Sequence, residues 1–308
     1  MDVAESHLAE CHDEFRRRPL RRGALMLLAA SCAAGWASGA DATFLRRSVV
    51  EIAPRPDDLT TGATGASYQP IFGAGDAQAS QLQGIARYGA LTVEPNGASA
   101  SVSYPAEEQI YFVLAGKATL VYGGQRAAIR RNDFMYLPVG LKHGIANASD
   151  GPVRLLVIGF RIPGSTVVAP TPKLLLANAD DVPLVPVEGH GQTALFKLLM
   201  GTTDSRRDKL AAASQMVSLF IMDFAPGGTN IPHHHEMEEE IYYILRGHGD
   251  MVAGGGAEGN EGRYAAKEGD AYFIRLNATV GFYSGSQSGE HDLVLAVRSR
   301  FPFSKSVP

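Results

Sequence analysis

The strongest constraint on the fold is an internal duplication. The segment QIYFVLAGKATLVYGG at residues 109–124 aligns without gaps with EIYYILRGHGDMVAGG at residues 240–255, and seven of the sixteen positions are identical. A further pair follows: RNDFMYLPVGLKHGIANAS after the first copy and EGDAYFIRLNATVGFYSGS after the second. The spacing between the two copies is too long for the repeat of a solenoid. The chain therefore contains two similar domains.

Each copy predicts strands rather than helices. A β-branched and aromatic run is followed by a glycine, a second strand-like run and a double-glycine turn, which is typical of antiparallel hairpins. The chain has 34 glycines and 17 prolines among 308 residues, and its pattern favours many short strands. We predict an all-β protein of two barrels, over residues 43–181 and 182–308, in which residues 182–214 link the first barrel to the second.

The N-terminal segment, residues 1–42, has the pattern of a secretory signal peptide. Five arginines within residues 16–22 precede a short apolar run, and the Ala-Asp-Ala sequence at residues 40–42 fits a cleavage site with Thr43 as the mature start. The apolar run is shorter than the roughly 20 residues that a membrane span needs. We predict a periplasmic or secreted protein without a membrane span; a lipoprotein anchored at Cys32 is the alternative.

Composition limits the chemistry and the partners. The two cysteines, Cys11 and Cys32, both lie in the predicted signal peptide, so the mature chain would depend on packing rather than on disulfides. The formal net charge is −4, and beyond the N-terminus the arginines and lysines are scattered. We therefore expect a small-molecule substrate and no nucleic-acid partner.

A segment rich in histidine and glutamate, IPHHHEMEEEIYYILRG, lies at residues 231–247. Alternate residues of a strand share a face, so His233 and His235 point the same way and His234 the other way. Glu240, on the following strand, can reach the same interior. Two imidazoles and one carboxylate suit a divalent first-row metal. Four other side chains are expected to face water: His234, Glu236, Glu238 and Glu239.

This pattern resembles the cupin superfamily, and the whole chain resembles a two-domain bicupin. The first cupin motif has a glycine, His-x-His, a glutamate and a second glycine; at that spacing this sequence carries Gly227, His233, His235, Glu240 and Gly247. The resemblance covers residues 85–160 and 215–300. It implies one antiparallel jelly-roll barrel in each domain.

The second cupin motif departs from the family in this domain. Counting from Gly269, Arg275 stands in place of the proline and Asn277 in place of the glycine. Val280 stands where the family has its fourth ligand, a histidine. Valine cannot bind a metal, so the predicted site is open, as in non-haem Fe(II) oxygenases. Four residues are alternatives for the missing ligand: His248, His291, Tyr272 and Tyr283.

The first domain shows the opposite loss. Val102 and Tyr104 stand at the positions of the motif histidines, and Gln109 replaces the glutamate. The second motif is nearly intact and consists of Asn132 in place of glycine, Pro138, Gly140, His143 and Asn147. One histidine with a glutamine and a tyrosine is a poor metal site. We expect His143 to be a buried, hydrogen-bonded relic; a small-molecule pocket without metal is the alternative.

The resemblance to quercetinase-like bicupins implies a dioxygenase that acts on a phenolic or 1,3-dicarbonyl substrate. His233, His235 and Glu240 would hold the metal, with iron or manganese expected first and zinc, nickel or copper as alternatives. Arg275 and Tyr272 are the predicted substrate-binding residues, because Arg275 could pair with a substrate carboxylate. The alternatives are an exposed strand position for Arg275 and a plain core position for Tyr272.

Other functions fit the same residues. Ureidoglycine aminohydrolases are bicupins with metal in the second domain alone, although their ligand pattern is not His-x-His. Isomerase and decarboxylase activities also stay open, as does a non-catalytic periplasmic cupin that binds a ligand or a metal. Cupins often assemble edge to edge, so the resemblance also implies a homodimer.

Overall fold

The computed structural model describes residues 43–168, 171, 173–255, 261–287 and 289–301. All the described residues belong to one compact unit. The predicted signal peptide and its cleavage site, residues 1–42, lie outside the described residues.

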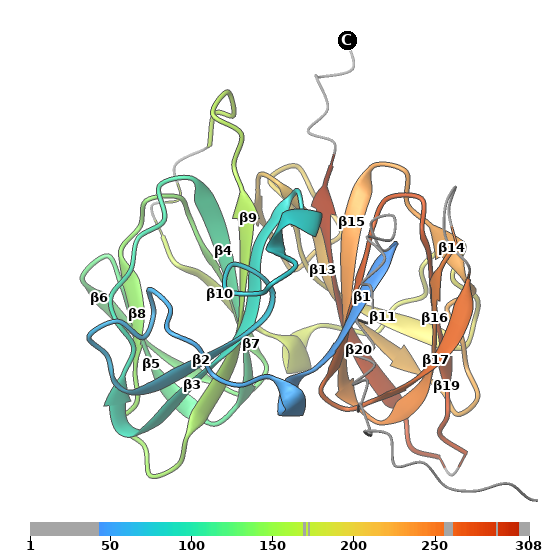
Figure 1. The fold of residues 1–308 in the computed structure, drawn as a ribbon, viewed down its shortest axis with the longest axis horizontal. Coiled ribbons are helices and arrows are strands. Elements are labelled where there is room, and N and C mark those ends of the chain that lie inside the picture. Colours follow the sequence, from blue (N-terminus) through green and yellow to red (C-terminus); the bar gives the residue numbers. More distant parts are fainter. Residues whose placement is uncertain (1–42, 169–170, 172, 256–260, 288, 302–308) are drawn as a thin grey trace, which may run out of the picture. The chain divides into compact units, whose positions relative to one another are not determined.

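The first barrel is a nine-stranded sheet with the order β10-β7-β4-β9-β3-β8-β5-β6, and β2 pairs with β3 (Figure 1). Every pairing in it is antiparallel. Its strands are β2 (Thr64–Gly73), β3 (Ile85–Ala98), β4 (Glu107–Ala115), β5 (Lys117–Tyr122), β6 (Gln125–Arg130), β7 (Asp133–Leu137), β8 (His143–Ala146), β9 (Val153–Arg161) and β10 (Leu175–Asn178).

The second barrel combines a seven-stranded sheet, β1-β18-β15-β20-β13-β11-β12, with a four-stranded sheet, β14-β19-β16-β17. Its strands are β1 (Phe44–Ser48), β11 (Ala194–Thr202), β12 (Leu210–Ala213), β13 (Met216–Phe224), β14 (His233–His234), β15 (Glu238–Arg246), β16 (His248–Gly254), β17 (Gly262–Lys267), β18 (Asp270–Ile274), β19 (Thr279–Ser284) and β20 (Asp292–Arg300). Three short 3₁₀ helices complete the described elements: η1 (Val49–Glu51), η2 (Ala79–Gln81) and η3 (Ala179–Asp181). The predicted all-β fold of two jelly-roll barrels is confirmed.

The first described strand belongs to the sheet of the second barrel. β1 pairs antiparallel with β18, from Phe44 opposite Ile274 to Ser48 opposite Asp270, and Figure 1 shows it in blue beside the orange strands. Residues 43–48 fall within the first domain predicted from the sequence, yet their backbone completes the second sheet. Covering a sheet edge in this way protects amide groups that would otherwise pair with another chain.

Strand alternation divides the core into three clusters. On β4, Tyr111 and Val113 pack inside the first barrel, whereas Ile110 and Phe112 face a cluster that includes residues of both barrels. β15 repeats this arrangement, with Tyr242 inside the second barrel and its neighbours on the shared side. Each of these sheets is therefore apolar on both faces, which explains the continuous apolar runs in the two copies of the repeat.

The motif glycine at the end of β4 and β15 is required by a close backbone turn. Gly116 and Gly247 occupy equivalent positions in the two copies and have φ values of +81° and +89°. A Cβ on Gly116 would lie 2.4 Å from the carbonyl oxygen of Pro152, and one on Gly247 would overlap the Asp292 carboxylate. Only glycine fits both the positive φ and the contact.

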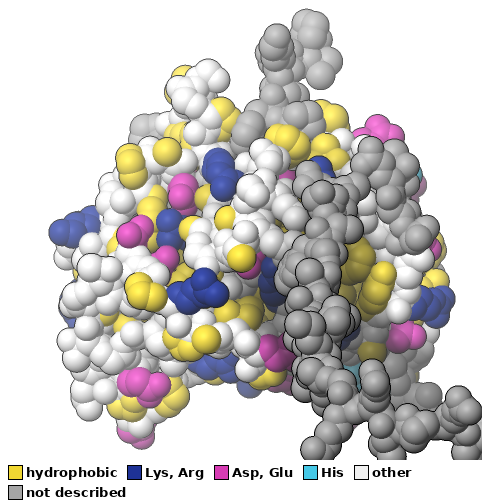
Figure 2. All heavy atoms as spheres, in the orientation of Figure 1, with side chains coloured by type: hydrophobic (Ala, Val, Ile, Leu, Met, Phe, Trp, Pro, Cys, Tyr) yellow, Lys and Arg dark blue, Asp and Glu magenta, His cyan; other side chains and the backbone are white. Residues whose placement is uncertain are grey.

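The described helices and one face of the described surface lack the patterns of membrane spans and of single-sign charge patches, respectively (Figure 2). None of the helices among the described residues is long and apolar enough to cross a membrane. On the face drawn in Figure 2, basic and acidic side chains of the described residues are interspersed with apolar ones rather than gathered by sign.

Candidate metal centre

The three predicted metal ligands lie together in the second barrel. His233 is on β14, His235 follows that strand directly, and Glu240 is on β15. One ligand atom of each lies within 4.8 Å of the other two, and the two imidazole rings are nearly perpendicular with centroids 4.9 Å apart. In the part of the chain that the structure describes, no other three histidine, cysteine or carboxylate side chains form such a group.

The backbone before β14 holds His233 in position through a strained residue. Ile231 has a φ of +56°, a left-handed conformation that β-branched residues rarely adopt. Its carbonyl oxygen lies 2.9 Å from Nδ1 of His233. With the Nδ1–H donated to that carbonyl, the lone pair of the ring is on Nε2, where a metal can bind it. Strain of this kind costs about 1–3 kcal/mol and persists where the surroundings impose it.

The electrostatics of the cluster fit a bound cation. Glu240 is only 2% exposed, and its Oε2 has no hydrogen-bond donor among the described residues although it lies 3.3 Å from Nε2 of His235. Burial is the largest of the effects that lower the pKa of His233, so this imidazole is neutral near pH 7. A buried carboxylate is costly unless a positive charge lies beside it. Two imidazoles and one carboxylate therefore fit a divalent first-row metal.

Charged side chains lie next to His235. Oε2 of Glu238 lies 3.9 Å from Nδ1 of His235 and 2.9 Å from a terminal nitrogen of Arg298. Arg298 also donates its Nε–H to Oγ of Ser218 at 2.9 Å, and it lies directly opposite Glu240 in the pairing of β15 with β20. Glu238 thus places a negative charge beside His235 without a hydrogen bond to it, and Arg298 balances that charge.

A small cavity of about 20 Å³ adjoins the three ligands. Besides the ligands, it is lined by Val187, His190, Phe196, Leu198, Arg207, Phe220 and Arg298. A volume of this size holds one water molecule or one ion. It does not hold a phenol or a dicarbonyl in addition.

Two of the four side chains expected to face water do so, and two do not. His234 and Glu236 are exposed. Glu238 is 21% exposed and pairs with Arg298. Glu239 is 1% exposed, and its carboxylate accepts the backbone N–H groups of residues 83–85 in the first barrel. The expectation was wrong for Glu239 because the periodicity of one strand does not reveal the shared interface on that side of β15. It was wrong for Glu238 because this side chain lies on the same face of β15 as Glu240, where it pairs with Arg298.

The other predicted site residues lie away from the cavity. None of the following lines it: Tyr272, Arg275, His248, His291 and Tyr283. Tyr272 is fully buried in the core of the second barrel, where its hydroxyl donates to the carbonyl of Ala265 at 3.2 Å. Arg275 is half-buried just beyond β18. Substrate binding by Tyr272 and Arg275 stays a prediction. Val280, opposite His233 in the register, is fully buried.

Sequence reasoning missed three polar residues of the cavity wall, His190, Arg207 and Arg298. His190 and Arg207 fall in the segment assigned to the linker, where no strand pattern indicated a direction. Arg298 carried a usable signal: on β20 it follows Val294 and Ala296 at a spacing of two, and both of these point into the barrel. Alternation along a strand therefore predicts an inward arginine at this position.

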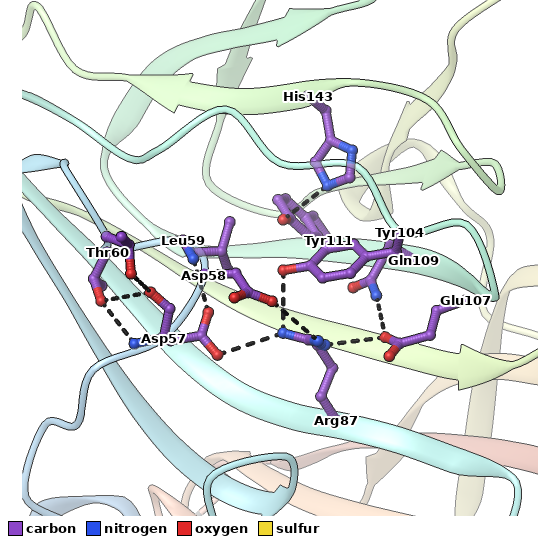
Figure 3. A network of polar contacts seen from close by, with 11 residues as sticks. Asp57, Asp58, Leu59, Thr60, Arg87, Tyr104, Glu107, Gln109, Tyr111 and His143 are labelled. Atoms are coloured by element: carbon purple, nitrogen blue, oxygen red, sulfur yellow. Dashed lines mark hydrogen bonds and ion pairs between the residues drawn. The ribbon is translucent and has the colours of Figure 1, made fainter.

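The equivalent place in the first barrel is filled by a buried polar network (Figure 3). His143 is 1% exposed, and its ring nitrogens contact the carbonyl of Leu141 at 2.9 Å and the hydroxyl of Tyr111 at 3.1 Å. Burial is the main cause that lowers the pKa of His143 to about 4. The structure thus places His143 among hydrogen-bonded core residues.

Arg87 lies at the centre of this network and supplies a positive charge. Its Nε lies 3.0 Å from Oε2 of Glu107, and a terminal nitrogen lies 3.4 Å from Oδ2 of Asp57 and 3.1 Å from the Tyr104 hydroxyl (Figure 3). Gln109 donates to the same Glu107 oxygen at 2.8 Å. Two positions at which cupins have ligands, those of Tyr104 and Gln109, therefore serve the arginine and its carboxylate instead.

A family model described as "Cupin domain" matches the sequence twice, at residues 89–159 and 220–286. The first match begins in β3 and ends in β9, and the second begins in β13 and ends just beyond β19. Each barrel therefore carries one match. A search of curated protein sequences gives no match to this chain.

Solved structures resemble the chain over most of its length. A putative glyoxylate induced protein from Pseudomonas aeruginosa has a TM-score of 0.66 at 19% identity, covering 85% of this chain and 90% of that chain. Protein Ylba from E. coli has a TM-score of 0.64 at 16% identity, with 86% and 94% covered. Oxalate decarboxylase from Lactobacillus farciminis, in a formate complex, has a TM-score of 0.60 at 16% identity, with 83% and 86% covered. At these identities the likeness concerns the fold.

Proposed function

We propose that this chain, which belongs to the cupin superfamily as a two-domain bicupin, is an enzyme with one divalent metal ion in its second barrel. The proposed reaction is of the dioxygenase type, on a small phenolic or dicarbonyl substrate. The observation that carries the proposal is the ligand group itself: His233, His235 and Glu240, with a buried carboxylate oxygen that has no hydrogen-bond donor among the described residues. Two histidines and one carboxylate are the donor set of non-haem iron oxygenases.

The chain's own residues would bind and orient an anionic substrate. Arg298 and Arg207 both line the cavity next to the ligands, so a phenolate or enolate oxygen would find positive charge on the protein side. Phe196 and Phe220 pack in the same wall with ring centroids 5.5 Å apart, which would exclude water from the reacting atoms. When bound, a redox-active metal such as iron or manganese would supply Lewis-acid and oxygen chemistry at this position.

Substrate entry requires a movement of the cavity wall, because the cavity holds about 20 Å³. Val187 and His190 lie on the loop between Val185 and Phe196, which is closed by an isolated β-bridge between those two residues. We propose that this loop opens to admit the substrate, since all the other wall residues except Arg207 and His235 lie on barrel strands.

The proposal can be tested on purified full-length protein. Metal content is measured by elemental analysis for the wild type, His235→Ala and the matched control His234→Gln, whose side chain is exposed on the same segment. Close to one metal per chain is expected in the wild type and in the control, and a strong loss in His235→Ala. Oxygen uptake is then measured with panels of phenols and 1,3-dicarbonyls. Absence of metal from the wild type would refute the enzyme proposal, and metal without uptake would refute the dioxygenase reaction.

A second candidate is a decarboxylase or related lyase that acts on a small carboxylate. The two arginines of the cavity wall favour it, because guanidinium groups bind carboxylates in a bidentate manner, and the chain's fold resembles that of an oxalate decarboxylase. Release of carbon dioxide from oxalate or other small dicarboxylates without net oxygen consumption would identify it. Hydrolysis of ureido acids, or tight binding without turnover, would favour the hydrolase or the binding protein.

We also propose that the chain is exported and forms a homodimer. The first rests on the basic and apolar pattern of residues 16–42, and the second on the resemblance to other cupins. Mass determination of the mature protein from the producing cell would show a start near Thr43. Light scattering would give the mass of the assembly.

A further inference from the structure

We infer that His190, a residue outside both cupin motifs, is the fourth protein ligand of the metal in the second barrel. This inference rests on the proposed function, since it requires that the barrel holds a metal. It assigns a replacement for the histidine that the chain lacks at Val280. The replacement comes from the loop before β11 rather than from a barrel strand.

The position of His190 supports the assignment. It lines the same cavity as His233, His235 and Glu240. Its ring is nearly perpendicular to that of His233, with centroids 5.0 Å apart, close to the 4.9 Å between His233 and His235. The ring of His190 also packs on Phe196, at a centroid distance of 5.0 Å and an interplanar angle of 72°. Three histidine rings thus lie in sequence along one wall of a cavity that has room for one ion.

The hydrogen bond of His190 leaves the correct nitrogen free. Its Nδ1 lies 3.0 Å from the carbonyl oxygen of Glu188, two residues earlier. His233 makes the same contact with the carbonyl of Ile231, also two residues earlier, at 2.9 Å. In each ring the Nδ1–H would be donated to the backbone, so Nε2 keeps its lone pair. This is the arrangement that fixes metal-binding histidines in proteins.

The loop permits the small adjustment that binding requires. The group of atoms within 4.8 Å of one another includes His233, His235 and Glu240 but not His190, so coordination would draw the His190 ring inward. His190 lies between Gly189 and Gly191, which have φ values of +83° and +80°. Glycines in this region adjust their dihedral angles at low cost. The loop remains attached at its ends through the bridge between Val185 and Phe196.

The first barrel shows that the corresponding loop delivers polar groups to this place. β2 and β11 occupy equivalent positions in the two repeats, beside β3 and β13 respectively. The segment before β2 carries Asp57, whose carboxylate lies 3.4 Å from the Arg87 guanidinium. In the first barrel this loop contributes the carboxylate of Asp57, which pairs with the Arg87 guanidinium. In the second barrel it contributes His190, next to the ligand group.

The test compares Co²⁺ binding by the wild type, His190→Gln, His190→Phe and the control His234→Gln. Apo-protein is titrated with Co²⁺, and the dissociation constant and visible absorption bands are recorded. Loss of a direct ligand is expected to weaken binding by at least the 10- to 100-fold or so that loss of an outer partner causes. Both His190 variants should show this loss with changed bands, and His234→Gln should match the wild type. In His190→Phe an aromatic ring still packs against Phe196, but the nitrogen that could bind Co²⁺ is absent. Weak Co²⁺ binding by this variant would therefore reflect the lost ligand rather than lost packing. Circular dichroism checks that the variant is folded.

The outcomes separate this inference from the proposed function. If the wild type binds no Co²⁺, the proposed metal site and the inference are both overturned. If the wild type and His234→Gln bind Co²⁺, and both His190 variants bind it with unchanged affinity and absorption, the inference alone is overturned and a three-ligand site stands. Weaker binding with altered bands in both His190 variants would establish His190 as a ligand.

Discussion

Replacing Glu239 by alanine should destabilise the protein although this side chain is on the opposite face of β15 from the proposed ligand Glu240. The carboxylate accepts the backbone N–H groups of Gln83 and Gly84 at 2.8 Å each and that of Ile85 at 3.3 Å. These residues lead into β3 of the first barrel, whereas Glu239 is on β15 of the second. One buried side chain of the second barrel therefore binds the backbone of the first.

The magnitude follows from these contacts. Hydrogen bonds to a charged group contribute roughly 1.5–3 kcal/mol each, so the two short bonds set the scale and the longer third adds little. Burial opposes them, because it costs free energy to desolvate a carboxylate, and it is the main cause that raises the pKa of Glu239. After this offset we expect Glu239→Ala to lower the free energy of unfolding by about 2–4 kcal/mol at neutral pH.

The pH dependence has a definite sign. Since the folded state raises the pKa of Glu239 above its ordinary value of 4.5, it binds the proton more tightly than the unfolded state does. The stabilisation from protonation is fully present below pH 4.5 and is lost as the pH rises through the raised folded pKa. The difference between wild type and Glu239→Ala should therefore be larger at pH 4.5 than at pH 7.

Urea unfolding followed by circular dichroism measures these differences. The matched control is Glu236→Ala, which removes an exposed carboxylate from the same segment and should change stability by less than about 0.5 kcal/mol. The counterpart, Glu108, accepts N–H groups from residues 214–216 at 2.8–2.9 Å and the Tyr136 hydroxyl at 3.0 Å. Glu108→Ala should cost at least as much as Glu239→Ala. If Glu239→Ala and Glu108→Ala have the same free energy of unfolding as Glu236→Ala, the reasoning is refuted.

Three further predictions concern single residues. Ile231→Asn should raise the free energy of unfolding by about 1 kcal/mol in urea titrations, because asparagine tolerates the left-handed backbone that isoleucine occupies; a loss of stability would contradict the strain. Arg87→Met should lower it by about 3–5 kcal/mol, since Asp57, Glu107 and the more exposed Asp58 lose their buried partner; a neutral result would show that the network carries no net stabilisation. For His143, the pKa is lowered from 6.5 to about 4, so its stabilising effect is present above pH 6.5 and is lost as the pH falls through 4. Between these values the wild type should lose about 3 kcal/mol more stability than His143→Gln, and parallel acid unfolding curves would exclude this role.

The fold was predictable because its signals repeat. Two copies of one strand pattern, aligned without gaps, give the number of domains and their all-β class from local residues alone. The exchange of β1 into the second sheet was not predictable, because strand pairing between distant segments leaves no mark in the periodicity of a short strand. The burial of Glu239 was not predictable for the same reason: its partners are backbone groups of the other barrel, far away along the chain.

The candidate site was predictable only where a motif carried it. His233, His235 and Glu240 have the spacing of the first cupin motif; alternation predicts that the two histidines share a face, and the motif places Glu240 on the strand that follows. His190 and Arg207 lie on connecting segments, whose course is set by tertiary contacts. The substitution of Val280 signalled a missing ligand, but the place from which a replacement comes depends on which loop covers the barrel.

The two barrels differ in the strand that carries the arginine next to their equivalent glutamates. The segment Glu107–Gln109 corresponds to Glu238–Glu240 in the alignment of the two copies, and each barrel pairs the first of these glutamates with an arginine. In the first barrel the arginine comes from β3, and Gly159, opposite Gln109 on β9, leaves space for it.

In the second barrel the arrangement is reversed. Arg298 on β20 occupies the place opposite Glu240, and Ser218, which is equivalent to Arg87, leaves space on β13 and accepts the Arg298 hydrogen bond. The arginine has thus moved from one neighbouring strand to the other. In the first barrel Arg87 contacts Tyr104, at the position of a lost ligand, and supplies the cation itself; in the second, Arg298 leaves both histidines free to bind one. The proposed metal in the second barrel and the guanidinium in the first would therefore be alternative ways to place positive charge among equivalent buried acceptors.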